Sequence, residues 1–234
     1  MNKATSNLDA RAPLCAANYR VASPFDSRTI SSGEERFVAA VESDTGIANI
    51  RLLGDPVLRE IARPVESYDD PIFIRDSQLL YATPLDFCQK NKFGRAISAP
   101  QIGCGQRLIA MHLNGEPHFI VNPKITWTSA ERFTMWDDCM SFPSLLVRLE
   151  RARSISIHFQ NESGKHEDWE HLDIATSELL QHEIDHLDGV LAIDRAIDKE
   201  SIILRSTYFR MRKYFRKLVD WKISAGSALP SEAL

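Results

Sequence analysis

The chain has little cysteine, and its cysteines are scattered. Only four of the 234 residues are cysteine, and no two of them stand in C-x-x-C spacing. This argues against a disulfide framework and favours a reducing compartment, so we expect a cytoplasmic protein. The chain also lacks an apolar run long enough to span a bilayer, which predicts no membrane partner.

Strong net charge and internal repeats are missing as well. The formal net charge is −4, so charge alone does not make the whole molecule a nucleic-acid or membrane binder. No repeat or long low-complexity tract interrupts the chain. What is present is a 44% share of hydrophobic residues, enough to bury the core of one ordinary domain with some additional length.

The chain divides into a central domain and two terminal segments. We expect a folded domain over residues 49–222 and a flexible tail over 223–234. Residues 1–48 are predicted to be a loosely ordered extension, with a short helix at 34–43. The alternative is organellar targeting, because residues 1–30 contain several Arg, Ser and Ala and few acids, as transit peptides do.

Three segments have the composition and alternation of β-strands. Residues 107–113 and 118–128 flank a turn signal, Asn-Gly-Glu-Pro, and residues 153–160 alternate apolar and polar side chains. Strands that precede a buried helix in the sequence are typical of an α+β fold.

Three segments have helical spacing. Residues 71–92 contain Pro84, so a helix there is expected to break, kink or restart. Residues 174–188 have an apolar stripe with helix-ending residues on both sides. Residues 199–222 place apolar side chains three and four apart, which predicts a last helix.

The helix predicted at 174–188 carries a His-Glu-x-x-His motif within Gln-His-Glu-Ile-Asp-His. Asp173 or Thr176 could cap its start, and Gly189 stands just past its end. His182 and His186 are four residues apart, so they share one face of the helix. This pattern is known from zinc-binding helices. The alternative is two histidines packed on a helix beside an ordinary surface glutamate.

A metal site of this kind normally needs a third protein ligand. A metzincin protease would have a histidine at position 192, where this chain has Ala192. Glu200 is the nearest downstream glutamate, but it is too close in sequence to come from a second packed helix. Upstream, the segment Asp-Asp-Cys-Met-Ser offers Cys139. The alternative for Cys139 is a buried structural thiol.

Three motifs together resemble those of the peptide deformylase family. They are Gly-Arg-Ala-Ile-Ser-Ala-Pro-Gln-Ile-Gly at 94–103, Asp-Asp-Cys-Met-Ser at 137–141 and Gln-His-Glu-Ile-Asp-His at 181–186, in the family's order. Residues 55–65 also resemble the family's entry segment. The resemblance covers about residues 49–220. It implies small antiparallel sheets packed around a central metal-binding helix, with a C-terminal helix.

The resemblance also implies a reaction and a set of roles. The family removes the formyl group from the N-terminal methionine of nascent polypeptides and releases formate, so the expected substrate is an N-formylated peptide. One divalent ion is implied, Fe²⁺ with Zn²⁺ or Ni²⁺ as alternatives, and its ligands would be Cys139, His182 and His186. Glu183 would be the general base and acid. Gln101 and the backbone N–H of Met140 would stabilise the oxyanion.

The chain departs from the family pattern around the expected substrate cleft. Asp137 and Asp138 replace a Glu-Gly pair, Ala96 replaces a glycine, and Ser98 precedes the Ala-Pro-Gln segment. Glu178, one turn before His182, shares the face of the two histidines. The predicted substrate-binding residues are Gly94, Ala96, Ser98, Asp138 and Glu178.

Glu178 has two interpretations. A carboxylate in a side-chain pocket is costly unless it is solvated or paired, so the pocket would prefer a polar or basic side chain over methionine. Alternatively, Glu178 is an acid of the helix's N-terminal turn, favoured by the helix dipole. Asp185 faces away from the histidines and is expected either to pair with Arg151 or to be solvated.

Other functions remain open from sequence. The same site could act on a different acyl or amide substrate, or it could be a binding protein without turnover, which Glu183 and Gln101 argue against. Residues 205–222 are rich in Arg and Lys, with Asp220 as their single acid. The family resemblance implies a ribosome contact there, and the alternative is a solvated basic face over an apolar stripe.

Overall fold

Two antiparallel sheets form the framework of the computed structural model, which describes residues 49–91, 93–113 and 116–221. The larger sheet has the spatial order β1 (Ala96–Ser98), β2 (Leu108–Leu113), β3 (Glu116–Thr128), β6 (Ile155–Gln160) and β7 (His166–Trp169). The smaller sheet has the order β4 (Arg132–Asp137), β5 (Leu145–Ala152) and β8 (Ile202–Leu204). The predicted α+β class is confirmed. The predicted strands correspond to β2, β3 and β6, whereas β4 and β5 were not predicted.

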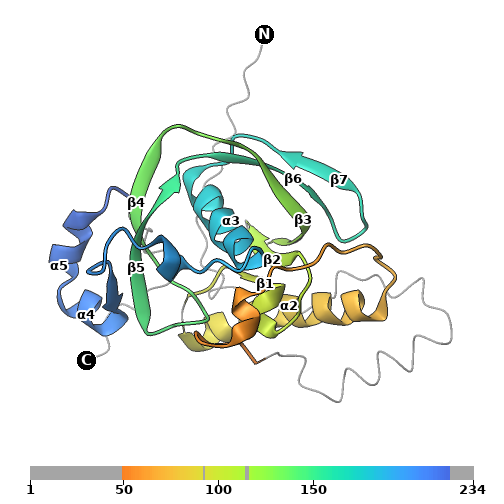
Figure 1. Ribbon diagram of the computed structural model, residues 1–234, viewed down its shortest axis with the longest axis horizontal. Helices are drawn as coiled ribbons and strands as arrows, with labels where there is room; N and C mark the ends of the chain where they lie inside the picture. The colour runs from red at the N-terminus through yellow and green to blue at the C-terminus, as the bar shows by residue number, and fades with distance from the viewer. Residues whose placement is uncertain (1–48, 92, 114–115, 222–234) are drawn as a thin grey trace, which may run out of the picture.

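The helix α3 (Ile174–Leu187) lies between the two sheets, as Figure 1 shows. Its apolar stripe includes Leu180 and Ile184, which belong to one core cluster with Ile109 and Met111 of β2. Burial of this stripe anchors α3 in the middle of the molecule. The histidines lie on another face of the same helix.

Both ends of α3 are fixed by local chemistry. The carboxylate of Asp173 accepts hydrogen bonds from the backbone N–H of Ala175 at 2.8 Å and of Thr176 at 3.1 Å. Asp173 is therefore the N-cap, and Thr176 lies inside the helix. After the C-terminus, Gly189 has a φ of +71°, and a Cβ built there would stand 2.6 Å from the carbonyl oxygen of Arg59. Arg59 ends the short 3-10 helix η2 (Pro56–Arg59) of the entry segment.

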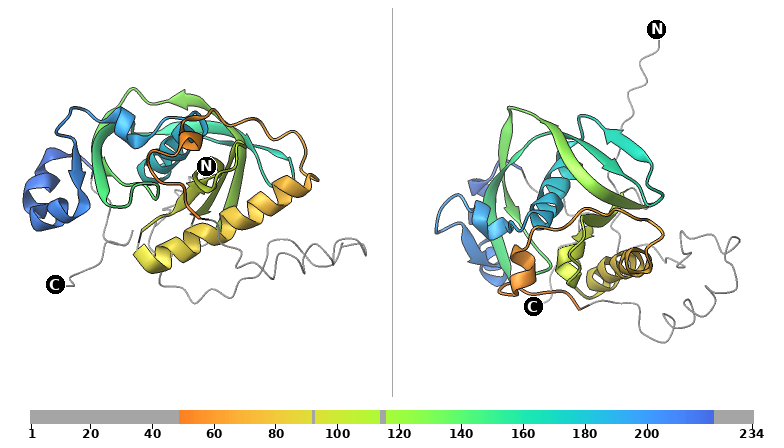
Figure 2. Two further views of the ribbon diagram at one scale, coloured as in Figure 1. Left: turned by 60° about the horizontal axis from the view of Figure 1, so that its bottom comes forward. Right: turned by 45° about the vertical axis from the view of Figure 1, so that its right-hand side comes forward.

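The helix α2 (Pro71–Asn91) covers the other face of β1 and β2, and the left view of Figure 2 shows it running along the sheet. Phe73 and Leu80 pack in one cluster with Leu108 and Ala110. The expected break or restart at Pro84 is wrong, since one helix spans residues 71–91 with Pro84 inside it. Apolar packing on both sides of the proline outweighs the cost of about 3 kcal/mol that an interior proline carries.

The C-terminal region is not the single helix predicted for residues 199–222. It consists of β8 and then three short helices, α4 (Arg205–Arg210), α5 (Arg212–Phe215) and η5 (Arg216–Leu218). Pairing of Ile203 with Leu146 draws the first residues into the smaller sheet. Met211, at φ −118°, separates α4 from α5, and the indole N–H of Trp136 donates to the carbonyl of Phe215 at 2.9 Å. These tertiary contacts override the helical periodicity.

Several expectations fall on other parts of the chain. The extension at 1–48, its helix at 34–43 and the tail at 223–234 lie outside the described residues. Among the helices of the described part, none combines the length and the apolar character needed to cross a membrane.

The glycine after α3 gives a stability prediction. We expect Gly189→Ala to lower the free energy of unfolding by about 1–3 kcal/mol, because the left-handed backbone is strained for alanine and the new Cβ meets backbone of η2. Urea unfolding of the wild type and the variant at equal metal content measures this difference in the free energy of unfolding. Gly105→Ala is the control, since a Cβ there meets nothing within 4 Å. Equal stability of the two variants would contradict the packing described.

Candidate metal centre

Three buried side chains place metal-ligating atoms together. His182 and His186 come from α3, and Cys139 comes from the loop between β4 and β5. One sulfur and two ring nitrogens lie within 4.8 Å of one another, and Sγ of Cys139 is 3.2 Å from Nε2 of His186. Atoms that each stand about 2.0–2.3 Å from one tetrahedral ion are separated by such distances. The helix face and the loop thus bring the predicted ligand set together.

The chemistry of the donors fits a divalent ion. A thiolate with two imidazoles is a donor set for zinc or iron. Among the described residues, the buried atoms Oε2 of Glu183 and Nδ1 of His186 have no hydrogen-bond partner. Buried polar atoms are usually paired, so an orphaned carboxylate oxygen beside this cluster indicates a site made for further occupants. The residues present therefore fit a bound metal.

A buried carboxylate holds one ligand in place. Oδ2 of Asp137 lies 3.0 Å from Nδ1 of His182 and accepts a hydrogen bond from Nη2 of Arg151 at 3.1 Å. Burial opposes ionisation of Asp137, but His182 and Arg151 outweigh it and hold its pKa well below the usual range. Asp137, at the end of β4, therefore fixes the orientation of the His182 ring.

Arg151 joins a second carboxylate to the same network. Its Nη1 donates to Oδ2 of Asp185 at 2.5 Å, and Arg195 donates to both oxygens of the same carboxylate. The predicted pairing of Asp185 with Arg151 is confirmed, and the solvated alternative is wrong. The network ties α3 to β5, on which Arg151 lies.

Gln101, in the 3-10 helix η3 (Ala99–Ile102), is held as a rigid donor. Its Oε1 accepts hydrogen bonds from the backbone N–H and the hydroxyl of Ser98, at 3.0 and 3.1 Å. This leaves Nε2 to donate toward Cys139 Sγ at 3.5 Å and Ser141 Oγ at 3.2 Å. Ser98 was predicted to bind substrate. Instead it is fully buried and orients the amide of Gln101.

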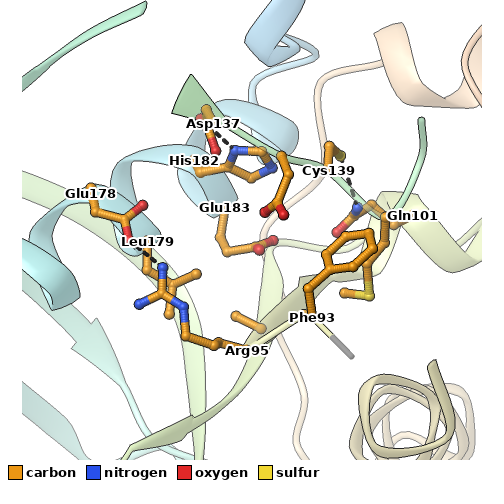
Figure 3. Close-up of a pocket in the computed structure, with 13 residues that line it drawn as sticks. Phe93, Arg95, Gln101, Asp137, Cys139, Glu178, Leu179, His182 and Glu183 are labelled. Carbon is orange, nitrogen blue, oxygen red and sulfur yellow. Dashed lines mark hydrogen bonds and ion pairs between the residues drawn. The ribbon is translucent and has the colours of Figure 1, made fainter. Parts of the chain in front are cut away.

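Glu183 is buried beside the ligands and lines the adjacent pocket. Burial raises its pKa to about 7, although His182 opposes the shift. Figure 3 shows its carboxylate between His182 and the side chains of Phe93 and Arg95. A carboxyl group with a pKa near neutrality can both accept and release a proton.

The pocket contains most of the predicted site residues. These are Gly94, Ala96, Gln101, Asp138, Cys139, Met140, Glu178, His182 and Glu183. Gly94 has a φ of +103°, and a Cβ there would come within 3.1 Å of the sulfur of Met140. Sequence reasoning missed Phe93, Arg95 and Leu179, although Arg95 stands between two predicted residues in the Gly94–Gly103 segment.

Glu178 is paired and buried. Its side chain is 2% exposed and forms an ion pair with Arg95, whose Nη1 also donates to the carbonyl of Ala175 at 3.3 Å. Because α3 begins at Ile174, Glu178 lies in the second turn. It is therefore a residue of the pocket wall, and the interpretation as an acid of the first turn is wrong. Burial raises its pKa, and Arg95 opposes this shift.

Asp138 is paired as well. Its carboxylate accepts from Nη2 of Arg205 at 3.0 Å, and the guanidinium of Arg205 stands 4.0 Å above the ring of Phe93. The residue that begins α4 thus contacts two residues of the pocket.

Comparison with known proteins gives a consistent result. The family model for polypeptide deformylases matches residues 47–201. A peptide deformylase of Thermotoga sp. (strain RQ2) is 34% identical over 67% of this chain and 91% of its own length. One of Brucella suis biovar 1 is 35% identical over 74% of this chain and 94% of its own length.

Solved structures agree. The crystal structure of the Thermotoga maritima peptide deformylase superimposes with a TM-score of 0.59 at 34% identity, covering 65% of this chain and 99% of that one. A Synechococcus elongatus peptide deformylase in complex with actinonin gives a TM-score of 0.58 at 29% identity, covering 66% of this chain and 81% of that one. This chain belongs to the polypeptide deformylase family.

Proposed function

We propose that the chain hydrolyses the formamide bond at the N-terminal methionine of nascent polypeptides, releasing formate and a free amine. Family membership supports the activity. The observation that carries it is the buried group of Cys139, His182 and His186 beside a pocket that also contains Glu183. A divalent metal held by these three residues would supply Lewis-acid activation of water and of the formyl carbonyl at neutral pH.

Glu183 takes the role of general base and acid in this proposal. It accepts a proton from the water that attacks the formyl carbon and passes that proton to the departing amine nitrogen. Its burial, its raised pKa and its unpaired Oε2 support the role, as does its position directly after His182. The sum of the steps adds one water across the C–N bond.

Two N–H donors would stabilise the negative charge that develops on the formyl oxygen. Nε2 of Gln101 is held on the side of Cys139 because Ser98 occupies the amide oxygen. The backbone N–H of Met140, the residue after Cys139, is the second donor. Donors fixed before the reaction need no reorganisation in the transition state, which is what an oxyanion site requires.

The metal is proposed to be Fe²⁺, with Zn²⁺ or Ni²⁺ as alternatives. A thiolate and two imidazoles suit each of these ions. The expected compartment is the cytoplasm, as the few scattered cysteines suggest. A different acyl or amide substrate is the competing function. The relatives named above favour the formyl group over it.

The C-terminal region is proposed as a ribosome contact. Its exposed basic side chains, which lie within the stretch from α4 to η5, are Arg210, Arg212, Lys213, Arg216 and Lys217. Their spacing around Met211 and Tyr214, which are also exposed, gives a mixed basic and apolar surface. Such a surface would bind RNA phosphates through contacts that weaken with salt. The alternative is a solvated basic face.

The activity is tested by anaerobic purification, metal analysis and formate release from formyl-Met-Ala-Ser. We expect about one divalent ion per chain and formate release, with no release from acetyl-Met-Ala-Ser. Glu183→Ala should lower kcat by a factor of about 10²–10⁴ with unchanged metal content, because the proton carrier is lost. Glu200→Ala, on an exposed glutamate, is the control. An unaffected Glu183→Ala enzyme would contradict the assigned role.

The buried carboxylate behind His182 gives a second prediction. We expect Asp137→Ala to weaken metal affinity about 10–100-fold, because the imidazole loses the partner that orients it. Competition with a chelator measures this, and Asp137→Asn should lose less because it keeps an acceptor. Asp198→Ala removes an exposed carboxylate that pairs with Arg148 and should have no effect. Equal loss in Asp198→Ala would refute the positioning role.

The ribosome contact gives a third prediction. Reversing two charges, Arg212→Glu with Lys213→Glu, should reduce co-sedimentation with ribosomes. The remaining binding should depend less on salt. In a plot of the logarithm of the binding constant against the logarithm of the salt concentration, the slope should fall in magnitude by about one for each phosphate that is no longer bound. Lys124→Glu with Lys165→Glu makes the same charge change at exposed positions on the larger sheet and its β6–β7 turn. If both double variants bind equally, the basic face is only solvated.

A further inference from the structure

One wall of the pocket is an ion pair rather than an apolar surface. Figure 3 shows Glu178 of α3 and Arg95 of the segment before β1 joined beside Leu179, on the side of the pocket away from Gln101. Both residues line the pocket. The side chain of Glu178 is 2% exposed and that of Arg95 is 27% exposed, so the carboxylate is the more deeply buried member of the pair.

The position of this pair relates it to the substrate's first side chain. The formyl carbon has to reach the cluster of Cys139, His182 and His186 for hydrolysis. The side chain of the formylated residue is attached only two bonds beyond the formamide nitrogen, so it must lie in the space next to these ligands. Glu178 bounds that space one helical turn before His182, together with its partner Arg95 on the same wall.

Four carboxylates line the pocket, and all except Glu183 are paired with an arginine. Glu178 pairs with Arg95, Asp138 with Arg205, and Asp137 with Arg151. Each of these three carboxylates therefore has a guanidinium partner, although Arg151 is shared with Asp185. A lysine side chain would gain no unpaired acid from them and would lose its hydration, so the expected preference for a basic side chain does not follow from this geometry.

We propose that the Arg95–Glu178 pair determines side-chain specificity, so that an uncharged polar side chain such as glutamine is accepted about as well as methionine next to the formyl group. The inference rests on the proposed deformylase activity. A carboxamide has both a donor and an acceptor, which match the carboxylate and the guanidinium. Methionine is still accepted, because the pair satisfies itself and an apolar side chain leaves neither member without a partner.

The test compares kcat/KM for formyl-X-Ala-Ser peptides with Met, Gln, Lys and Glu at the first position. For the wild type we expect a Met-to-Gln ratio below about tenfold, and lower values for Lys and Glu, whose charges must be buried. Arg95→Leu with Glu178→Leu replaces the pair by apolar side chains and should raise the Met-to-Gln ratio at least about tenfold. A wild-type ratio above tenfold, or an unchanged ratio in the double variant, overturns the proposal.

A matched pair provides the control. Arg132 and Glu150 form an ion pair across β4 and β5 with both side chains about half exposed, and neither residue lines the pocket. Arg132→Leu with Glu150→Leu should leave the Met-to-Gln ratio as in the wild type. An equal change in this control would show that the ratio responds to general destabilisation, and it would overturn the proposal.

A single substitution covers the case in which the double variant does not fold. Glu178→Gln keeps a hydrogen-bond acceptor for Arg95 but leaves the guanidinium charge uncompensated. We expect kcat/KM for formyl-Glu-Ala-Ser to rise relative to formyl-Met-Ala-Ser, and no rise would count against the proposal. Absence of formate from every formyl peptide would instead refute the proposed function, so the two failures are distinguishable.

Discussion

The buried guanidinium of Arg151 is the contact on which the site depends. It lies on β5 and is bound to Asp137 at the end of β4 and to Asp185 of α3, and its side chain is 3% exposed. The metal ligands come from these same parts, two from α3 and one from the loop after β4. Removing one partner of such a buried network leaves a charge without compensation, at a cost of about 3–5 kcal/mol. The network thus holds helix and sheet in the register that the ligand set requires.

Charge pairing extends from the metal cluster into the substrate pocket. Three of the four carboxylates that line the pocket have a guanidinium behind them, and the partner arginines come from three separate places, before β1, on β5 and at the start of α4. Arg205 also stacks on Phe93, so the C-terminal region contacts the cleft directly. The polar lining therefore depends on contacts between segments that are distant in the sequence. Glu183, the proposed proton carrier, differs from the three paired carboxylates because its buried Oε2 has no hydrogen-bond partner.

Local signals in the sequence were enough to predict the helix that carries the His-Glu-x-x-His motif. Asp173 and Gly189 mark its ends, and the four-residue spacing of His182 and His186 fixes their common face. Cys139 could be assigned only through the resemblance of three motifs. The partners of Glu178 and Asp138 could not be predicted, because Arg95 and Arg205 meet them through contacts between residues distant in sequence. The prediction of a last helix at residues 199–222 was wrong for the same reason, because pairing with β5 and burial against Trp136 decide the structure of this region.

One thiolate and two imidazoles of this chain are proposed to hold the metal. X-ray absorption spectroscopy of the anaerobically purified protein would identify the ligand atoms around this metal. A zinc-loaded sample should show one sulfur at about 2.3 Å together with nitrogen or oxygen ligands at about 2.0–2.1 Å, and Cys139→Ser should remove the sulfur. A shell of nitrogen and oxygen alone in the wild type, or a sulfur that remains in Cys139→Ser, would contradict the account.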